Sequence, residues 1–442
     1  MVKLTQNVEV AYEVEGTYSD PAGSTLSHLG LLDTFDPRSV EMNITPVPSL
    51  GQSTDAFHAR GPLAVAVPLK VACQGTGWQQ LLGRAIGKTD VYGSVDAPHS
   101  LTTGVDSIAL LAREGSEYTL VTGVVPNEVT LTADYSTGGY ITCEANCTGF
   151  YTQDSVNDAN FSNDDGLLID DYSSVAFPAA PSADPLLPTD LTVSYAATTD
   201  ADGLQINRTA GHYVEIGERY MRIYDANGAL DTGYAQGDHA ALLADGVIDL
   251  DHTDTETITE LVAVLNAGVT SSATANAGSA DPQNLLKGIY RMTGSNVDIP
   301  VVADTDTTLT SLTNLKTVAL KIANNNTPIP GKVTRGDGTP SVVEWLQNKA
   351  ISRGKSDITL DLTMTAEDET LYDKYVAGTT IPLFRLDFGT SGSIALTNGT
   401  ITSFSRPLSP GGEIVDTLSI KFRGSGDIKN FSSFAISADW SL

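Results

Sequence analysis

The chain has 442 residues, with 25 Lys and Arg against 54 Asp and Glu, so its net charge is −29. At about 150 residues per domain, this length suggests about three domains. A hydrophobic content of 41% excludes a disordered polymer. The scarcity of Lys and Arg excludes a protein that binds nucleic-acid phosphates or anionic membranes, because both interactions need clustered basic residues.

The acidic excess has two interpretations. It keeps the molecule soluble and limits unplanned association. Alternatively, it indicates a halophilic, high-salt environment in which screening makes the self-repulsion tolerable. A chain that stays folded and assembled in dilute buffer would argue against the second interpretation.

The three cysteines, Cys73, Cys143 and Cys147, do not form the even-numbered framework of a disulfide-rich protein. Cys143 and Cys147 fall on one predicted strand, where four steps of about 3.3 Å place them too far apart for a bridge. We expect all three to be buried as small hydrophobic side chains.

The N-terminal residues 1–15 lack the apolar core and positive flank of a signal peptide. No run of about 18 apolar residues predicts a membrane-spanning helix. We therefore expect a chain that is made in the cytoplasm of its host, is not exported and has no membrane contact.

The chain contains an internal repeat. An N-x-T-P-[VI]-P motif at 43–48 returns at 325–330. Downstream of each motif, apolar residues alternate with other residues in the pattern of a strand. The alternating residues are Val67, Leu69 and Val71 in the first copy and Ile358, Leu360 and Leu362 in the second.

A helix is predicted after each strand, at 77–86 and at 366–377. The second helix begins with a capping-box signature at 365–368. Each helix is followed by a glycine suited to a left-handed C-cap, Gly87 and Gly378.

A β-hairpin follows in each copy, over 129–143 and 400–414, with the glycine pairs 138–139 and 411–412 at the turns. The flanks alternate apolar and polar residues, as half-buried antiparallel strands do. The first copy also contains an extra segment at 88–117. Because the elements recur in one order, we interpret the chain as a tandem duplication.

A different segment separates the copies. Residues 173–188 have the Pro-, Ala- and Ser-rich composition of a linker. The remaining segment has predicted strands at 191–195, 212–216 and 220–224, a turn at 225–228, a helix at 258–267 introduced by Thr257 and Glu260, and a loop at 269–284. The predicted organisation is a first unit at 1–172, the linker, an inserted α+β domain at 189–308 and a second unit at 309–442.

Chemical motifs are scarce. Residues 83–89 resemble a phosphate loop but have three residues between the glycines instead of four, and a helix precedes them where a strand is needed. No G-x-S-x-G motif is present, and the six histidines lack the spacing of a zinc site. The acidic turns at 163–166 and 200–203 do not continue into a complete calcium loop.

Paired carboxylates of the glycosidase kind stay open, because 54 acidic residues make some pairing inevitable. Nothing singles out one pair. The sequence therefore predicts no catalytic residue, no cofactor and no metal site, and we expect a protein that is not an enzyme.

The order of elements resembles the major tail tube proteins of long-tailed, siphovirus-like viruses of bacteria or archaea. The resemblance covers about 30–150 and 309–424. It is carried by Leu29–Asp33, Trp78–Leu82, Ala85–Gly87 and Cys147–Gly149 in the first unit, and by Asp357–Leu362, Leu371–Asp373 and Leu418–Phe422 in the second. The inserted domain departs from the minimal family.

The resemblance implies a mainly β fold, with two tandem β-sandwich or half-barrel units that each carry a flanking helix. It implies that six units form a ring, so that three copies of a two-unit chain give a pseudo-hexameric trimer. Rings would stack into the virion tail tube, which conducts viral DNA without binding it specifically. The implied partners are further copies and other tail proteins: tape measure, terminator and baseplate.

Two further expectations follow from this resemblance. The loops at 49–61 and 331–355 would reach the next ring, and the inserted domain would decorate the outer wall. One alternative is a tube-like relative, such as a tail terminator or a secretion-system tube. The others are a secreted, acidic, β-rich adhesin or surface-layer protein and a glycan-active tail enzyme. The missing signal peptide argues against secretion, and the dispersed aromatic residues argue against a glycan groove.

Overall fold

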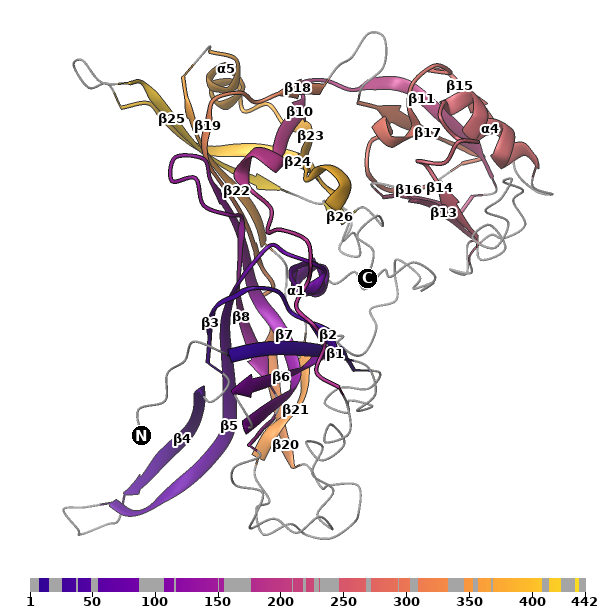
Figure 1. The fold of residues 1–442 in the computed structure, drawn as a ribbon. Coiled ribbons are helices and arrows are strands. Elements are labelled where there is room, and N and C mark those ends of the chain that lie inside the picture. Colours follow the sequence, from indigo (N-terminus) through magenta and orange to yellow (C-terminus); the bar gives the residue numbers. More distant parts are fainter. Residues whose placement is uncertain are drawn as a thin grey trace.

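The computed structural model describes residues 8–15, 26–36, 39–48, 55–86, 107–114, 117–149, 151–154, 176–208, 210–217, 220–225, 230, 246–267, 272–292, 294–302, 309–332, 346–352, 357–366, 369–407, 413–422 and 434–436. Over these residues the protein is mainly β, as the sequence predicts, with three α-helices and a large network of antiparallel strands (Figure 1).

The first unit consists of two layers of strands. The outer layer contains β1 (Val8–Val14), β2 (Ser27–His28), β6 (Ile108–Glu114), the first half of β7 (Glu117–Asp134) and β9 (Tyr151–Asp154). The inner layer contains β3 (Leu32–Phe35), β4 (Ser39–Pro48), β5 (Asp55–Ala72), β8 (Thr142–Gly149) and the second half of β7. The helix α1 (Gly77–Ile86) has the predicted bounds.

The second unit repeats this arrangement. Its outer layer contains β10 (Thr192–Ala196), β18 (Leu309–Ser311), β23 (Ile381–Asp387), the first half of β24 (Ser393–Ser405) and β26 (Phe434–Ile436). Its inner layer contains β19 (Leu315–Ala323), β22 (Asp357–Thr365), β25 (Val415–Phe422) and the second half of β24. β20 (Thr327–Lys332) and β21 (Leu346–Ser352) pair with each other in a separate two-stranded sheet. Its helix is α5 (Thr370–Ala377).

Equivalent strands have equivalent partners in the two units. β1 pairs with β2 and β6, just as β10 pairs with β18 and β23. β9 pairs with β7 in the way that β26 pairs with β24. The strand 192–196, which the sequence analysis assigns to the inserted domain, thus lies in the large strand network. We propose that the second unit begins at β10 and that the small domain is inserted between β10 and β18.

β7 and β24 each pass from the outer to the inner layer of their unit. Each strand has a left-handed residue where it changes layer, Gly123 with φ 62° and Asn398 with φ 55°. Glycine adopts this conformation without steric cost, and asparagine tolerates it better than most other residues. The two units therefore share this bend as well as their pairings.

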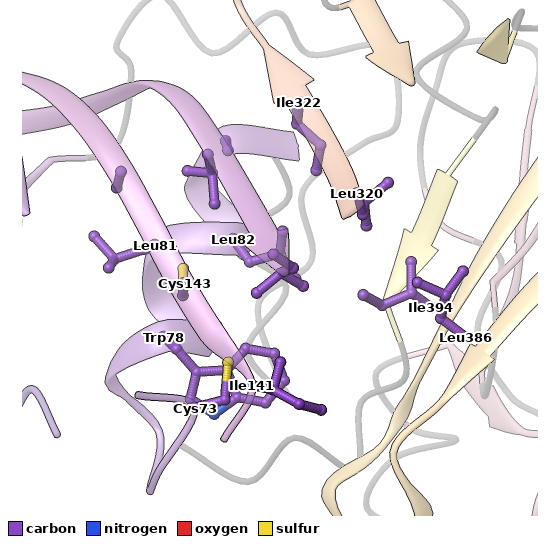
Figure 2. Close-up of a cluster of buried hydrophobic side chains, with 14 of the residues drawn as sticks. Cys73, Trp78, Leu81, Leu82, Ile141, Cys143, Leu320, Ile322, Leu386 and Ile394 are labelled. Atoms are coloured by element: carbon purple, nitrogen blue, oxygen red, sulfur yellow. The ribbon is translucent and has the colours of Figure 1, made fainter. Parts of the chain in front are cut away.

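One hydrophobic core extends through both units. In Figure 2, Trp78, Leu81 and Leu82 of α1 lie near Cys73, Ile141 and Cys143 of the first unit. Leu320, Ile322, Leu386 and Ile394 of the second unit approach the same cluster (Figure 2). The alternating apolar side chains of β5 and β22 point into this core. The residues that reveal the repeat in the sequence are therefore residues that form the core.

The small domain has a core of its own, with buried residues from Leu204 to Val301. It contains a three-stranded sheet of β11 (Asp200–Asn207), β15 (Ser272–Ala275) and β17 (Asn296–Val301). Its four-stranded sheet contains β12 (Tyr213–Ile216), β13 (Tyr220–Tyr224), β14 (Val247–Asp249) and β16 (Gly288–Arg291). This is an α+β composition, because α4 (Ile258–Ala267) packs on the same core.

The capping prediction for α4 is confirmed. The backbone N–H of Thr257 donates to Oε2 of Glu260 (2.9 Å), and the N–H of Glu260 donates to Oγ1 of Thr257 (3.3 Å). These reciprocal bonds satisfy two N–H groups that have no partner within the helix. Gly268 lies outside the described residues.

The capping prediction for the second-unit helix is wrong. α5 begins at Thr370 instead of 366, and the side chain of its N-cap residue, Glu369, makes no capping hydrogen bond to the helix. Thr365 is still part of β22, where it pairs with Val415, so the strand occupies the residue that the signature needs. The C-cap is confirmed, since Gly378 has φ 63° and its N–H donates to the carbonyl of Tyr375. Gly87 lies outside the described residues.

Three predicted loops contain strands. Residues 55–61 belong to β5, which pairs with β4. Residues 331–332 and 346–352 belong to the β20–β21 hairpin. Residues 272–275 form β15 and pair with β11. Main-chain pairing with a neighbour gives each segment a strand conformation that its composition does not indicate.

Both predicted hairpins pair as expected, β7 with β8 and β24 with β25. Gly138 has the positive φ that the turn needs, at 67°, and Gly139 does not. The second glycine pair at 411–412 and the turn residues 226–228 lie outside the described residues.

No helix in the described ranges combines the length and apolar character needed to cross a bilayer.

Candidate assembly surfaces

Of the two acidic segments considered for metal binding, one lies within the described residues. Residues 200–203 lie in β11, where a Cβ on Gly203 would stand 2.5 Å from the carbonyl oxygen of Ile299. Residues 163–166 lie outside the described part of the chain. Within that part, no group of three or more His, Cys, Asp or Glu could hold a metal ion.

Burial lowers the pKa of His28, whose Nδ1 accepts the N–H of Gly30 (3.0 Å).

The cysteines occupy the positions expected of them. Cys73, Cys143 and Cys147 are free and buried, and the last two lie on β8. Burial raises the pKa of Cys143 to about 12 and raises the pKa values of Cys73 and Cys147 as well. A thiol with so high a pKa carries almost no thiolate at neutral pH and is chemically inert.

The most informative surface is the contact between the two units. β7 pairs antiparallel with β19, from Thr317 opposite Asp134 to Ala323 opposite Glu128. Backbone bonds extend the ladder at both ends: Tyr135 N–H donates to the Lys316 carbonyl (2.9 Å), and Asn324 N–H donates to the Asn127 carbonyl (2.8 Å). We call this pairing the internal junction.

The internal junction is apolar on the core side and charged on the other. Leu131 and Leu320 face each other with 3% and 1% of their surfaces exposed. On the opposite side Lys321 Nζ lies 2.8 Å from a carboxylate oxygen of Glu128. Such partly exposed pairs contribute little, so the buried apolar residues supply most of the stability.

The junction joins the inner layers of the two units into one continuous sheet. From edge to edge its strand order is β3 with β4, then β5, β8, β7, β19, β22, β25 and β24. Within the described residues, β3 and β4 pair with β5 alone, and residues 400–405 of β24 pair with β25 alone. The sheet therefore ends in two open edges.

These open edges are the counterparts of the two strands that meet at the internal junction. β24 has the place beside β25 that β7 has beside β8. β3 has the place beside β5 that β19 has beside β22. The shared partners make Phe404 equivalent to Leu131, and Phe35 equivalent to Leu320. β24 at one edge therefore corresponds to β7, and β3 at the other edge corresponds to β19. The β3 edge of one copy could thus pair with the β24 edge of another copy as β19 pairs with β7 within the chain.

Burial distinguishes the junction from the open edges. Phe404 and Phe35 are only half-buried, whereas their equivalents are fully buried. Leu31, just before β3, has 49% of its surface exposed. An unpaired strand edge that also exposes apolar side chains is a template for pairing with another chain.

The side of the inner sheet that faces away from the core is rich in hydroxyl groups. It includes Thr130, Thr132, Thr359, Thr363 and Thr417, at positions that alternate with buried residues. Three lysines on this side are paired with carboxylates: Lys70 with Asp33 (3.3 Å), Lys321 with Glu128 (2.8 Å) and Lys421 with Asp357 (2.9 Å). Exposed Glu144 and Asp361 add negative charge to this side.

Two pairs of strands extend beyond the layers. β4 with β5, and β20 with β21, project at the lower end of the molecule in Figure 1. The segments predicted to reach a neighbour, 49–61 and 331–355, overlap these strands, although their sequence predicts loops. We call these two pairs the arms.

No protein-family model matches the chain, and no curated protein matches it. Among solved structures, a chain in the tail of an empty gene transfer agent particle matches with 16% identity and a TM-score of 0.21, over 29% of this chain and 86% of that one. A chain in the virion of a native gene transfer agent particle gives 16% identity and a TM-score of 0.21, over 29% and 88%.

A third match is to the baseplate of the anti-feeding prophage, with 14% identity and a TM-score of 0.17, over 26% of this chain and 80% of that one. The chain is thus partially similar in structure to components of phage-like tail particles. The similarity covers less than a third of the chain, and by itself it assigns neither a function nor an oligomeric state.

The family resemblance implies that neighbouring copies join edge to edge, but the sequence does not predict which strands form the open edges. The hairpin strands and the helices are predicted, and the pairing of β7 with β19 between the units is not. The duplication itself partly indicates the open edges. If two equivalent units contact each other within a chain, each unit also has an equivalent surface that this contact leaves unpaired.

Proposed function

We propose that this chain is a structural protein of a phage-like tail, whose copies join edge to edge into rings that stack into a tube. The observation that carries the proposal is the pair of open edges, since each is equivalent to one strand of the internal junction. A contact that already joins two units within a chain serves equally between chains. Repeating it at every edge closes the sheet and leaves no unpaired strand.

We propose a ring of three chains. Each chain supplies two equivalent units, and the tail tube proteins that its sequence resembles form rings of six units. A closed trimer of two-unit chains gives the same number with pseudo-sixfold symmetry. Stacking of such rings is a head-to-tail contact, which produces filaments, and the arms are placed to make it.

The tube would conduct DNA along the hydroxyl-rich side of the inner sheet. On that side Lys70, Lys321 and Lys421 are each paired with a carboxylate. Phosphate binding draws its free energy from counterions released by unpaired basic groups. A wall of hydroxyl groups and paired charges would release few counterions and so gain little binding free energy. DNA would therefore pass without adhering. This role needs no catalytic residue or cofactor.

The remaining partners follow from the same proposal. The arms and the ends of the tube would meet other tail proteins, namely tape measure, terminator and baseplate. The small domain would lie on the outer wall, because an insertion that faces the channel would obstruct DNA.

Negative-stain electron microscopy of the purified chain, at low and at molar salt, tests the proposal. We expect stacked rings with threefold modulation from the small domain. Rings with six copies of that domain would retain the tube and exclude the trimer. A monodisperse monomer at every salt and protein concentration would exclude the tube and favour an acidic adhesin. Single rings that never stack would favour a terminator-like relative.

A further inference from the structure

The two helices of the repeat differ in what covers them. In α1, residues 77–82, 84 and 85 are buried, with Leu81 and Ala85 fully inaccessible. Much of the cover comes from the second unit: the ring of Phe388 lies 5.5 Å from that of Trp78, and Gln79 Nε2 donates to the Ser391 carbonyl (3.4 Å). Leu320 of β19 belongs to the same buried cluster as Leu81 and Leu82 (Figure 2).

α5 has the equivalent place in the second unit, but its apolar side is open. Tyr372, Tyr375 and Val376 have 40%, 37% and 65% of their surfaces exposed, and Leu371 is the buried residue of the helix. Phe404 of β24 lies beneath them, with ring centroids 5.2 Å from Tyr372 and 6.1 Å from Tyr375. We call Tyr372, Tyr375, Val376 and Phe404 the α5 surface.

We propose that the α5 surface binds the β3 edge of a second copy of this chain, with Phe35 of that copy seated against Phe404. This inference rests on the proposed self-association and assigns the residues that perform it. The occupant follows from the internal junction. Leu320 faces Leu131 beneath α1, and the equivalents of these residues are Phe35 and Phe404.

The chemistry of the β3 edge complements the α5 surface. Leu31 is 49% exposed, and Leu32 and Phe35, at the two ends of β3, are half-buried. Both surfaces are therefore apolar, and they lie at opposite edges of one sheet. A fourth aromatic ring beside Tyr372, Tyr375 and Phe404 would form the offset or edge-to-face contacts that aromatic groups prefer. The contact is directional, because each copy offers one surface of each kind.

Directionality provides a sharp test with two variants. Phe35→Ser alters the β3 edge and leaves the α5 surface intact. Tyr372→Ser with Val376→Ser alters the α5 surface and leaves the β3 edge intact. Each variant alone has no complete junction, so we expect at least about a tenfold loss of self-association by analytical ultracentrifugation. Mixed in equal amounts, they retain one complete junction and should form heterodimers that grow no further.

Leu187→Ser is the matched control, because Leu187 is an exposed apolar residue, at 49%, that belongs to neither surface. It should assemble like the wild type, and circular dichroism should show all variants folded. Wild-type rings together with unimpaired rings of both altered variants would overturn this contact and leave the proposed function standing. Rings rather than dimers from the mixture would do the same. A wild-type chain that never self-associates would overturn both.

Discussion

Leu131 of β7 and Leu320 of β19 face each other across the two strands that join the halves of this chain. Both are buried, and around them one core extends from the first unit into the second. Their equivalents, Phe404 and Phe35, lie at the two open edges of the same sheet. The chain thus contains one completed copy of the contact that it would make with its neighbours.

The internal junction should be a main source of stability. Leu320→Ala removes a buried side chain from a core shared by both units, so we expect a loss of about 2–5 kcal/mol in the free energy of unfolding. Thr132→Ala, on the other side of the neighbouring strand, should cost less than about 1 kcal/mol. Urea unfolding of both variants at one protein concentration measures the difference. Equal losses would mean that the junction is not packed as described.

Gly378 should be required for its backbone conformation and not for its size. Its φ is 63°, and an added Cβ would meet no atom within 4 Å. Gly378→Ala should therefore destabilise by about 1–2 kcal/mol through left-handed strain alone. Gly294 also has open space around it but no such φ, so Gly294→Ala should be neutral or slightly stabilising. Thermal unfolding of the two variants compares them directly, and matching melting temperatures would refute the assignment.

The cysteines should not react with thiol reagents in the folded protein. Burial raises the pKa of Cys143 from 9.0 to about 12, so the folded state holds a proton that the unfolded state releases between these values. The contribution of the protonated Cys143 thiol to the stability of the folded state is complete below pH 9 and is lost as the pH rises towards 12. A thiol reagent at pH 8 should label none of the three in native buffer and all three in denaturant. Rapid native labelling would show that the core is open.

The small domain should be dispensable for ring formation. It has its own core, and the strands that flank it, β10 and β18, are paired so that Ala196 lies opposite Leu309. In the first unit, β1 ends at Val14 and β2 begins at Ser27, which shows that a short connection can link the equivalent strands. Replacing 197–308 by residues 15–26 should leave tubes with a thinner wall in electron micrographs. Loss of all assembly would assign the domain a role in the ring.

Shortening an arm should separate ring formation from stacking. Thr327 and Ser352 lie opposite each other at the base of β20 and β21. Deleting 328–351 and joining these residues by a Gly-rich turn should leave rings that do not stack, as seen by electron microscopy. The variant without the small domain, which loses more residues, is the control. Normal tubes from the shortened arm would exclude it from the contact between rings.

Much of the fold can be predicted from the sequence where a pattern is local. α1 and α4 have their predicted bounds, because glycine spacing and a capping box fix them. The strands around Val67 and Ile358 follow from period-two alternation over one shared core.

The features that sequence reasoning missed depend on distant partners. β15 and the arms are strands because another segment pairs with them, and their composition is that of loops. The start of α5 differs because Thr365 stays paired with Val415. The open edges arise from a contact between units about 190 positions apart, which no local pattern encodes.

The most direct test of edge-to-edge assembly is a disulfide between copies. Thr34 and Ser405 are exposed and are equivalent to Ala319 and Thr132, which face each other at the internal junction. Under oxidising conditions, the Thr34→Cys and Ser405→Cys double variant should form covalent oligomers that end at three chains on a non-reducing gel. Either single variant should not, and the native cysteines are buried too deeply to interfere. A double variant that assembles like the wild type yet never cross-links would contradict the account.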